Sequence, residues 1–334
     1  MQASYRKYTL HFKVPSGTSR GVLTTKETYF LEVKNGEKTG LGECGLFRGL
    51  SCDDVPNYEE TLAWLCENIN KDTDFLKEKL RRYPSIWIGY EQALRNLDYG
   101  GALYFPSELT QGLGQIAING LIWMGSQESM QQQIEAKLAQ GFDCIKLKIG
   151  VDWKVERNIL AQLRRLFPKE QLELRVDANG AFDFDEAQKV LEDLYQLDIH
   201  SIEQPIKAGN KAQMQQLCAS TPTPIALDEE LIGVVNLDEK RELLEFIQPQ
   251  YIILKPSLVG GFSGSDEWIM LAESLGIGWW ITSALESNIG LNAIAQYTYT
   301  KNNPMPQGLG TGELFTNNLE TPLFLEKNQL RFLV

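Results

Sequence analysis

Charged residues recur at a regular interval through the middle of the chain, each at the end of a short apolar run. The intervals are 29, 26, 25 and 27 residues, and the positions are Lys148, Asp177, Glu203, Asp228 and Lys255. Such an interval suits one strand, one helix and two loops. Burying a charge at the end of a strand costs free energy, so such a residue is expected to have an oppositely charged partner or a functional role. The repeat therefore predicts alternating strands and helices whose strand ends carry a site.

The same alternation extends from residue 115 to the last strand-like piece. Eight strands are expected, near residues 117, 146, 175, 202, 226, 253, 281 and 308. Helical patterns separate them at 127–140, 152–167, 183–196, 210–219, 237–247, 264–275 and 287–301. Eight parallel strands with helical crossovers are typical of a barrel with its active site at the carboxyl ends of the strands. A doubly wound open sheet is the alternative, and would use only two or three strand ends.

The first 105 or so residues follow a different pattern. Alternating runs at 4–14, 26–34 and 38–43 predict three strands, with the first ended by a loop at Pro15–Gly21 and a hairpin turn at Asn35-Gly36. Helical patterns follow at 57–81 and 84–103. These elements predict a separate α+β unit. The tail from Phe324 to Val334 alternates again and is expected to join this unit as an extra strand.

Composition excludes several classes of function. The net charge of −12 argues against a nucleic-acid or anionic-membrane surface, but not against a small anionic substrate. His11 and His200 have no metal-ligand neighbours, which argues against a zinc site or a Ser/His/Asp triad. Five cysteines without a CxxC pair indicate free thiols in a reducing compartment. Because the chain shows neither a signal-peptide core nor an apolar run of about 18 residues, a cytoplasmic protein is expected.

Two glycine motifs admit a phosphate-binding interpretation. Gly40-x-Gly42-x-x-Gly45 follows a strand but opens no apolar helix, so a loop that covers a cleft is favoured over a dinucleotide site. Gly260-Gly261 precedes a helical pattern and predicts either a small anion nest or a flexible loop.

Three carboxylates end three consecutive predicted strands, namely Asp177, Glu203 and Asp228. Adjacent strand ends lie about 5 Å apart, so uncompensated carboxylates would repel one another and raise their pKa values. Hard oxygen ligands without Cys or His select Mg²⁺ or Mn²⁺. The alternative is that each carboxylate caps a helix or pairs with a lysine. Three carboxylates at three consecutive strand ends favour a metal site.

Lys146 and Lys148 are two residues apart on a strand and therefore share a face. Adjacent ammonium groups and a divalent cation lower the pKa of a lysine toward that of a general base. A solvated edge strand is the alternative, although the apolar residues around the pair argue against it. Lys255 is expected to face the pair across the barrel. Lysines opposed across a metal predict proton abstraction next to a carboxylate, because cations stabilise the enediolate as it forms.

These residues resemble the muconate-lactonizing subgroup of the enolase superfamily over nearly the whole chain. The matching segments are Lys146-x-Lys148, Asp177-Ala-Asn179, Glu203-Gln-Pro205, Asp228-Glu229 and Lys255-Pro256. The resemblance implies a modified TIM barrel, (β/α)7β, with an N-terminal α+β capping domain. It places the cap at 1–108, the barrel at 109–312 and a returning C-terminal segment at 313–334. The loops Pro15–Gly21 and Gly42–Cys52 would close over the barrel.

Within this subgroup, two segments are similar to signatures of o-succinylbenzoate synthases, Thr282–Leu291 and Lys255–Gly261. Dipeptide epimerases usually carry an Asp-x-Asp pair near the last strand, and Gly308–Glu313 has none. The resemblance thus implies a dehydration that yields o-succinylbenzoate on the route to menaquinone. N-acylamino-acid racemisation or dipeptide epimerisation remains the alternative, and a non-catalytic metal-binding protein is a third class.

The resemblance also assigns roles to individual residues. Asp177, Glu203 and Asp228 would bind Mg²⁺, with Mn²⁺ as the alternative ion. Lys148 would remove the α-proton and then protonate the departing β-hydroxyl in a syn elimination, while Lys255 would stabilise the enediolate. The expected partner is a small-molecule carboxylate. Residues expected to contact it or support the site are Lys146, Arg175, Asn179 and Ser283.

Overall fold

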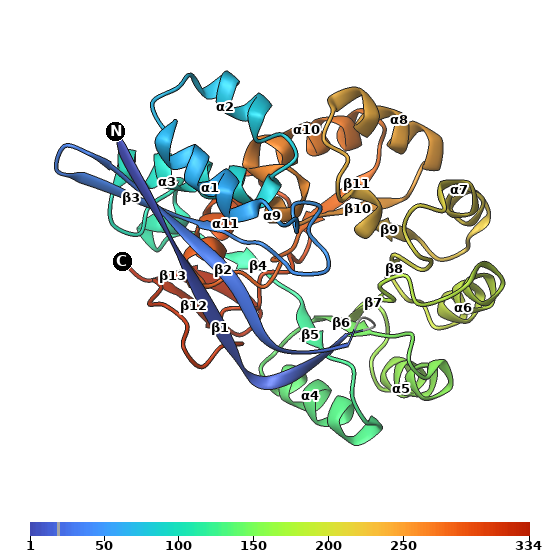
Figure 1. The fold of residues 1–334 in the computed structure, drawn as a ribbon. Coiled ribbons are helices and arrows are strands. Elements are labelled where there is room, and N and C mark those ends of the chain that lie inside the picture. The colour runs from blue at the N-terminus through green and yellow to red at the C-terminus, as the bar shows by residue number, and fades with distance from the viewer. Residues whose placement is uncertain (19–20) are drawn as a thin grey trace.

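The computed structural model describes residues 1–18 and 21–334, and shows an N-terminal α+β domain packed beside a barrel (Figure 1). The N-terminal sheet is antiparallel with strand order β1-β2-β3. Its strands are β1 (Gln2–Thr18), β2 (Gly21–Asn35) and β3 (Lys38–Cys44). Three helices follow, α1 (Tyr58–Glu67), α2 (Thr73–Lys79) and α3 (Pro84–Tyr99). The helical pattern predicted over 57–81 is split, because the Asp72 side chain caps a new helix by accepting bonds from Asp74 and Phe75 N–H.

The first hairpin is longer than the sequence predicted. β1 continues through Pro15 to Thr18, and β2 begins at Gly21. Proline is tolerated there because β1 is an edge strand whose register shifts between His11 and Ser16. The prediction that Pro15 ends the strand is therefore wrong. Residues 19–20 of the expected covering loop lie outside the described residues. The turn at Asn35-Gly36 is confirmed, with Asn35 paired to Lys38 and Gly36 at a φ of 60°.

The barrel predicted from the strand–helix alternation is confirmed. Seven parallel strands form one sheet in the order β11-β10-β9-β8-β7-β6-β5. They are β5 (Gly120–Ile122), β6 (Cys144–Lys148), β7 (Glu173–Asp177), β8 (Ser201–Glu203), β9 (Ile225–Leu227), β10 (Tyr251–Leu254) and β11 (Gly278–Ile281). Gln307 bridges to Ile118 and Gly308 bridges to Thr282, both in parallel. This short eighth piece joins the two edges of the sheet.

Helices surround the strands on the outside (Figure 1). They are α4 (Gln127–Ala139), α5 (Trp153–Leu166), α6 (Phe184–Gln196), α7 (Lys211–Ser220), α8 (Leu237–Ile247), α9 (Pro256–Val259), α10 (Gly261–Ser274) and α11 (Asn288–Thr300). Short 3-10 turns occur at Leu109–Gln111 and Glu229–Leu231. α6 illustrates why the sequence folds this way, since Asp183 and Glu186 form a capping box and the apolar face of the helix is buried. No helix within the described part of the chain has the length and apolar character needed to cross a membrane.

The C-terminal tail pairs differently from the prediction. β12 (Leu323–Glu326) and β13 (Gln329–Phe332) form a hairpin that joins β4 (Ile116–Ala117), not the β1-β2-β3 sheet. The expected extra strand of the N-terminal sheet is therefore wrong. The link to β1 comes from the preceding segment, where Phe315 bridges to Phe12 and Thr316 N–H donates to the His11 carbonyl.

Both glycine motifs serve packing between the two domains or within the cap. A Cβ on Gly40 or Gly42 would lie 2.0 Å from a carbonyl oxygen of α3, so these glycines let β3 pack closely on that helix. At Gly260-Gly261, α10 begins and the N–H groups of Phe262 and Ser263 donate to the carboxylate of Glu91 on α3. The acceptor at this helix start is thus a carboxyl group of the protein itself.

Candidate active site

Strand pairing brings the predicted catalytic residues together at the mouth of the barrel. Lys148 pairs with Asp177 across β6 and β7, and Asp177 pairs with Glu203 across β7 and β8. Asp228 and Lys255 directly follow β9 and β10. The three carboxylates are at most 2% exposed. Because the strands are parallel and in register, residues far apart in the sequence meet at one edge.

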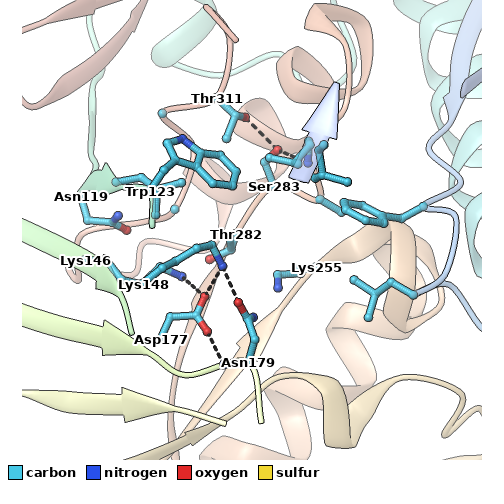
Figure 2. A pocket seen from close by; sticks show the side chains of 18 residues that line it. Asn119, Trp123, Lys146, Lys148, Asp177, Asn179, Lys255, Thr282, Ser283 and Thr311 are labelled. Carbon is cyan, nitrogen blue, oxygen red and sulfur yellow. Dashed lines mark hydrogen bonds and ion pairs between the residues drawn. The ribbon is translucent and has the colours of Figure 1, made fainter. Parts of the chain in front are cut away.

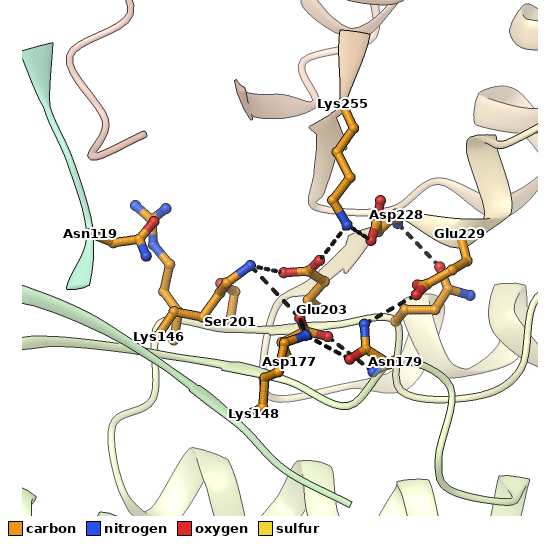
Figure 3. A network of polar contacts seen from close by, with 12 residues as sticks. Asn119, Lys146, Lys148, Asp177, Asn179, Ser201, Glu203, Asp228, Glu229 and Lys255 are labelled. Carbon is orange, nitrogen blue, oxygen red and sulfur yellow. Dashed lines mark hydrogen bonds and ion pairs between the residues drawn. The ribbon is translucent and has the colours of Figure 1, made fainter. Parts of the chain in front are cut away.

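Lysines and carboxylates alternate across this mouth (Figure 3). Lys148 Nζ lies 2.8 Å from Asp177 Oδ2. Lys146 Nζ lies 2.5 Å from Glu203 Oε2 and 3.8 Å from Asp177 Oδ2. Lys255 Nζ pairs with Asp228 Oδ2 and lies 3.7 Å from Glu203 Oε1. These ion pairs join buried groups of opposite charge, which limits the cost of burying them.

This balance shifts the pKa values of the buried groups. Burial raises the pKa of Asp177, but Lys148 and Lys146 lower it further, so its net pKa lies below the ordinary value. Burial lowers the pKa of Lys255, yet Asp228 and Glu203 raise it above the usual range. Lys146 likewise has a raised pKa, because Glu203 and Asp177 outweigh its burial. The expected lowering of lysine pKa therefore does not hold for Lys146 in this arrangement, since carboxylates and not a cation are its nearest charges.

The carboxylate set fits a hard divalent cation by its chemistry. It consists of oxygen donors on adjacent strands, with buried Glu203 Oε1 making no hydrogen bond among the described residues. As the side chains stand, no group of three ligands within residues 1–18 and 21–334 is gathered tightly enough to hold an ion. The reason is visible in Figure 3, where the ammonium groups of Lys146 and Lys255 lie between the carboxylates.

The remaining predicted residues fall into two groups. Asn179 accepts a 2.7 Å bond from Lys148 Nζ and donates to Glu229, and Ser283 donates a 2.8 Å bond to Glu286. Lys146, Asn179 and Ser283 all line a cavity at the barrel mouth. Arg175 is not among the residues that line it. Its guanidinium donates to Glu173 and to the Pro306 carbonyl, deeper in the barrel.

The cavity at the mouth has a volume of about 70 Å³ and is bounded by both domains (Figure 2). Leu23 of β2 and the loop residues Phe47 and Leu50 cover it from the N-terminal domain. These three residues that cover the cavity were not predicted from the sequence, and neither was Trp123, whose ring centroid lies 5.9 Å from Lys148 Nζ. Trp123 directly follows β5, so its place after an apolar run was the available signal.

Comparison with known proteins agrees with this fold and arrangement. Residues 129–327 match the family model of the enolase C-terminal domain-like family. The chain is 45% identical to an o-succinylbenzoate synthase of Desulfotalea psychrophila, over 98% of this chain and 97% of that one. The crystal structure of MenC from this organism superposes with a TM-score of 0.88 at 42% identity, covering 99% of each chain.

Two further relatives show the breadth of the group. An N-succinylamino acid racemase of Thermus thermophilus is 31% identical over 86% of this chain and 79% of the racemase. The structure of an o-succinylbenzoate synthase from Thermosynechococcus elongatus, complexed with Mg in its active site, has a TM-score of 0.78 at 22% identity and covers 96% of each chain. Fold and site together define a barrel enzyme with lysines and buried carboxylates at the strand ends. The chain belongs to the enolase superfamily.

Proposed function

We propose that this enzyme is an o-succinylbenzoate synthase that dehydrates 2-succinyl-6-hydroxy-2,4-cyclohexadiene-1-carboxylate. The observation that carries the proposal is the meeting of Lys148 and Lys255 with three buried carboxylates at the strand ends, where Lys148 pairs with Asp177 and Lys255 with Asp228. The 45% identity to an o-succinylbenzoate synthase over 98% of the chain supports it. Menaquinone biosynthesis is the pathway that this product implies. We place the enzyme in the cytoplasm, which its five free cysteines support.

We also propose Mg²⁺ as the cofactor, held by Asp177, Glu203 and Asp228, with Mn²⁺ as the alternative. When bound, the ion would neutralise the substrate carboxylate and the negative charge that develops beside it. The support comes from the donor set, which offers three buried carboxylates and no sulfur or imidazole.

The protein residues account for the proton movements. Lys148 Nζ takes the proton from the carbon next to the carboxylate, and the C–H electrons form the enediolate. The C–O bond to the β-hydroxyl then breaks, and Lys148 returns the proton to the departing oxygen on the same face, so that water leaves and the ring becomes aromatic. Lys255 remains an ammonium on the opposite face, as its raised pKa favours, and stabilises the negative charge. Leu23, Phe47 and Leu50 keep bulk water out of the cavity.

Racemisation of N-succinylamino acids is the second candidate. The 31% identity to the Thermus thermophilus racemase favours it, because opposed lysines can exchange a proton on either face of a carbon. Lys255 would then be the second acid/base. Incubation of an N-succinylamino acid in D₂O should introduce deuterium at the α-carbon. Loss of racemisation in a Lys255→Arg variant that still exchanges the proton of one enantiomer would support this activity.

The main proposal is tested by supplying the cyclohexadiene carboxylate with Mg²⁺ and following the absorbance of the aromatic product. We expect turnover by the wild type, and a loss of about 10²–10⁴-fold in Lys148→Ala, the usual contribution of a general acid–base group. Lys169→Met, at an exposed lysine away from the cavity, is the matched control. Absence of turnover by the wild type, or full activity in Lys148→Ala, would overturn the proposal.

A further inference from the structure

The cavity at the catalytic lysines is too small for the whole proposed substrate. Its volume is about 70 Å³, whereas pockets that enclose an organic ligand typically measure about 300–1,000 Å³. A second chamber of about 620 Å³ lies next to it. Only the reacting end of a ring with a long acyl arm fits in the first cavity, so the arm needs an adjoining space.

The two spaces share a wall. The residues that line both are Asn119, Leu121, Trp123, Gly310 and Thr311. Trp123 is the largest of them, and Gln133 of α4 holds its backbone by accepting from its N–H at 2.8 Å and donating to its carbonyl at 3.2 Å. The Trp123 side chain lies between Asn119 and Ser283 in Figure 2, at the edge of the cavity that holds Lys148. Its ring therefore borders both the general base and the second chamber.

Charge indicates which direction an anionic arm takes. Among the described residues of the N-terminal domain, those that line the first cavity are Leu23, Phe47 and Leu50, which are all apolar. Within residues 1–18 and 21–334, the charged residues that line the second chamber are Lys13, Lys137 and Glu313, which sum to one positive charge. Burying a carboxylate against an apolar wall is costly, whereas a chamber with a cation offers a partner. The terminal carboxylate of the acyl arm is therefore better placed in the second chamber.

We propose that the second chamber binds the carboxylate-terminated acyl arm of the substrate, that Lys137 is the cation facing that carboxylate, and that Trp123 borders the passage between the two spaces. This assignment rests on the proposed function, because the arm belongs to that substrate. It makes Lys137 a residue that determines specificity and not part of the proton-transfer machinery.

The surroundings of Lys137 suit this role. Its stem packs against Gly120, where an added Cβ would lie 3.2 Å from Lys137 Cδ, and its Nζ lies 4.8 Å from the Phe142 ring centroid. Gln140 Oε1 is 3.4 Å from Nζ, a long hydrogen bond that a carboxylate can replace. Burial lowers the pKa of Lys137, and Glu313 is the carboxylate that raises it. Glu313 therefore attracts the same ammonium that a ligand carboxylate would bind.

The test compares two ligands that differ only at the end of the arm. o-Succinylbenzoate ends in a carboxylate, and 2-butyrylbenzoate carries a methyl group there. We expect Lys137→Met to weaken calorimetrically measured binding of the first about 10-fold and of the second less than about 2-fold, as for loss of one charge pair. Lys137→Arg should restore most of the difference, and Lys169→Met should show none. Equal effects of Lys137→Met on both ligands, or no effect on either, would overturn the assignment.

A second variant tests the chamber without changing its charge. Ala136 is exposed on α4 and lines the chamber, so Ala136→Trp fills the space while keeping the helix. We expect a rise in KM of about 10-fold for the cyclohexadiene carboxylate with kcat nearly unchanged. An unchanged KM would count against the chamber. Wild-type turnover separately decides the proposed function, because a protein that binds both ligands as expected but dehydrates nothing would refute only that function.

Discussion

Two groups of buried carboxylates lie near the cavity and are compensated in different ways. At the barrel mouth, Asp177, Glu203 and Asp228 alternate with lysine ammonium groups. At the junction with the N-terminal domain, Glu43 and Glu286 are fully buried and accept hydrogen bonds from hydroxyl and backbone donors. The donors to Glu43 are Thr28, Ser287 and Gly290, and those to Glu286 are Ser257, Ser283 and Ala284.

The difference separates a reactive site from a rigid support. A lysine on a flexible stem can leave a carboxylate when another cation or a substrate arrives, so the mouth can exchange partners. Backbone N–H groups cannot leave without local unfolding, so the junction holds its geometry. Glu286 illustrates what the rigid group positions. Its carboxylate accepts hydrogen bonds from Ser283, which lines the cavity, and from Ser257, two residues beyond Lys255.

The largest expected effect comes from neutralising the mouth. Glu203→Gln removes the anion between Lys146 and Lys255, and a broken buried ion pair typically costs about 3–5 kcal/mol. It also removes a proposed metal ligand, so activity should fall more than about 100-fold, since even an outer partner of a ligand is worth about 10–100-fold. Urea unfolding and product absorbance measure the two effects. Unchanged stability and activity would show that the mouth does not depend on charge balance.

A smaller effect is expected at another buried carboxyl group between the domains, Glu91 of α3, which accepts hydrogen bonds from the start of α10. Burial raises the pKa of Glu91 to about 7, although Ser263 and the backbone donors lower it. The native state therefore holds this proton more tightly than the unfolded chain, whose glutamate pKa is about 4.3. As pH rises from about 4.5 to 7.5, the wild type should lose up to about 3 kcal/mol relative to Glu91→Gln.

Urea unfolding of both proteins at several pH values measures this relative loss. The difference between them cancels the titration of all other groups. A difference that stays constant between pH 5 and 8 would mean that Glu91 is as well compensated in the native state as in water. The charged form of Glu91 would then be stabilised in the native state, as the carboxylates at the barrel mouth are.

The sequence predicted the mouth far better than the junction. Lys148, Asp177, Glu203, Asp228 and Lys255 follow from local patterns, because each ends an apolar strand and parallel register brings strand ends together. Glu43 and Ser287 are 244 residues apart, and no periodicity connects them. The cap strand that carries Glu43 and the loop that carries Glu286 meet only through domain packing. Trp123 was missed for a related reason, since its role depends on two cavities formed by distant segments.

A third prediction concerns Glu286 itself. In Glu286→Gln one oxygen becomes an NH₂ group, so one of its N–H or O–H donors loses an acceptor, which typically costs about 1–3 kcal/mol. Because Ser283 and Ser257 would shift together, kcat should fall about 10-fold while metal-dependent binding of o-succinylbenzoate is nearly kept. A loss as large as that in Glu203→Gln would place Glu286 in the reactive group instead of the support.

The smallest expected effect is a gain in stability. Lys26 of β2 is 6% exposed, and its Nζ has no hydrogen-bond partner in the described parts of the chain. Burial lowers the pKa of Lys26 more than nearby Glu286 and Glu43 raise it. Burying the ammonium therefore destabilises the fold more than its attraction to these carboxylates stabilises it. Lys26→Met should therefore raise the free energy of unfolding by about 1 kcal/mol, with Lys38→Met on the exposed hairpin as the control. Destabilisation by Lys26→Met would show that an ammonium does compensate Glu43 and Glu286, and the two groups of carboxylates would then follow the same rule.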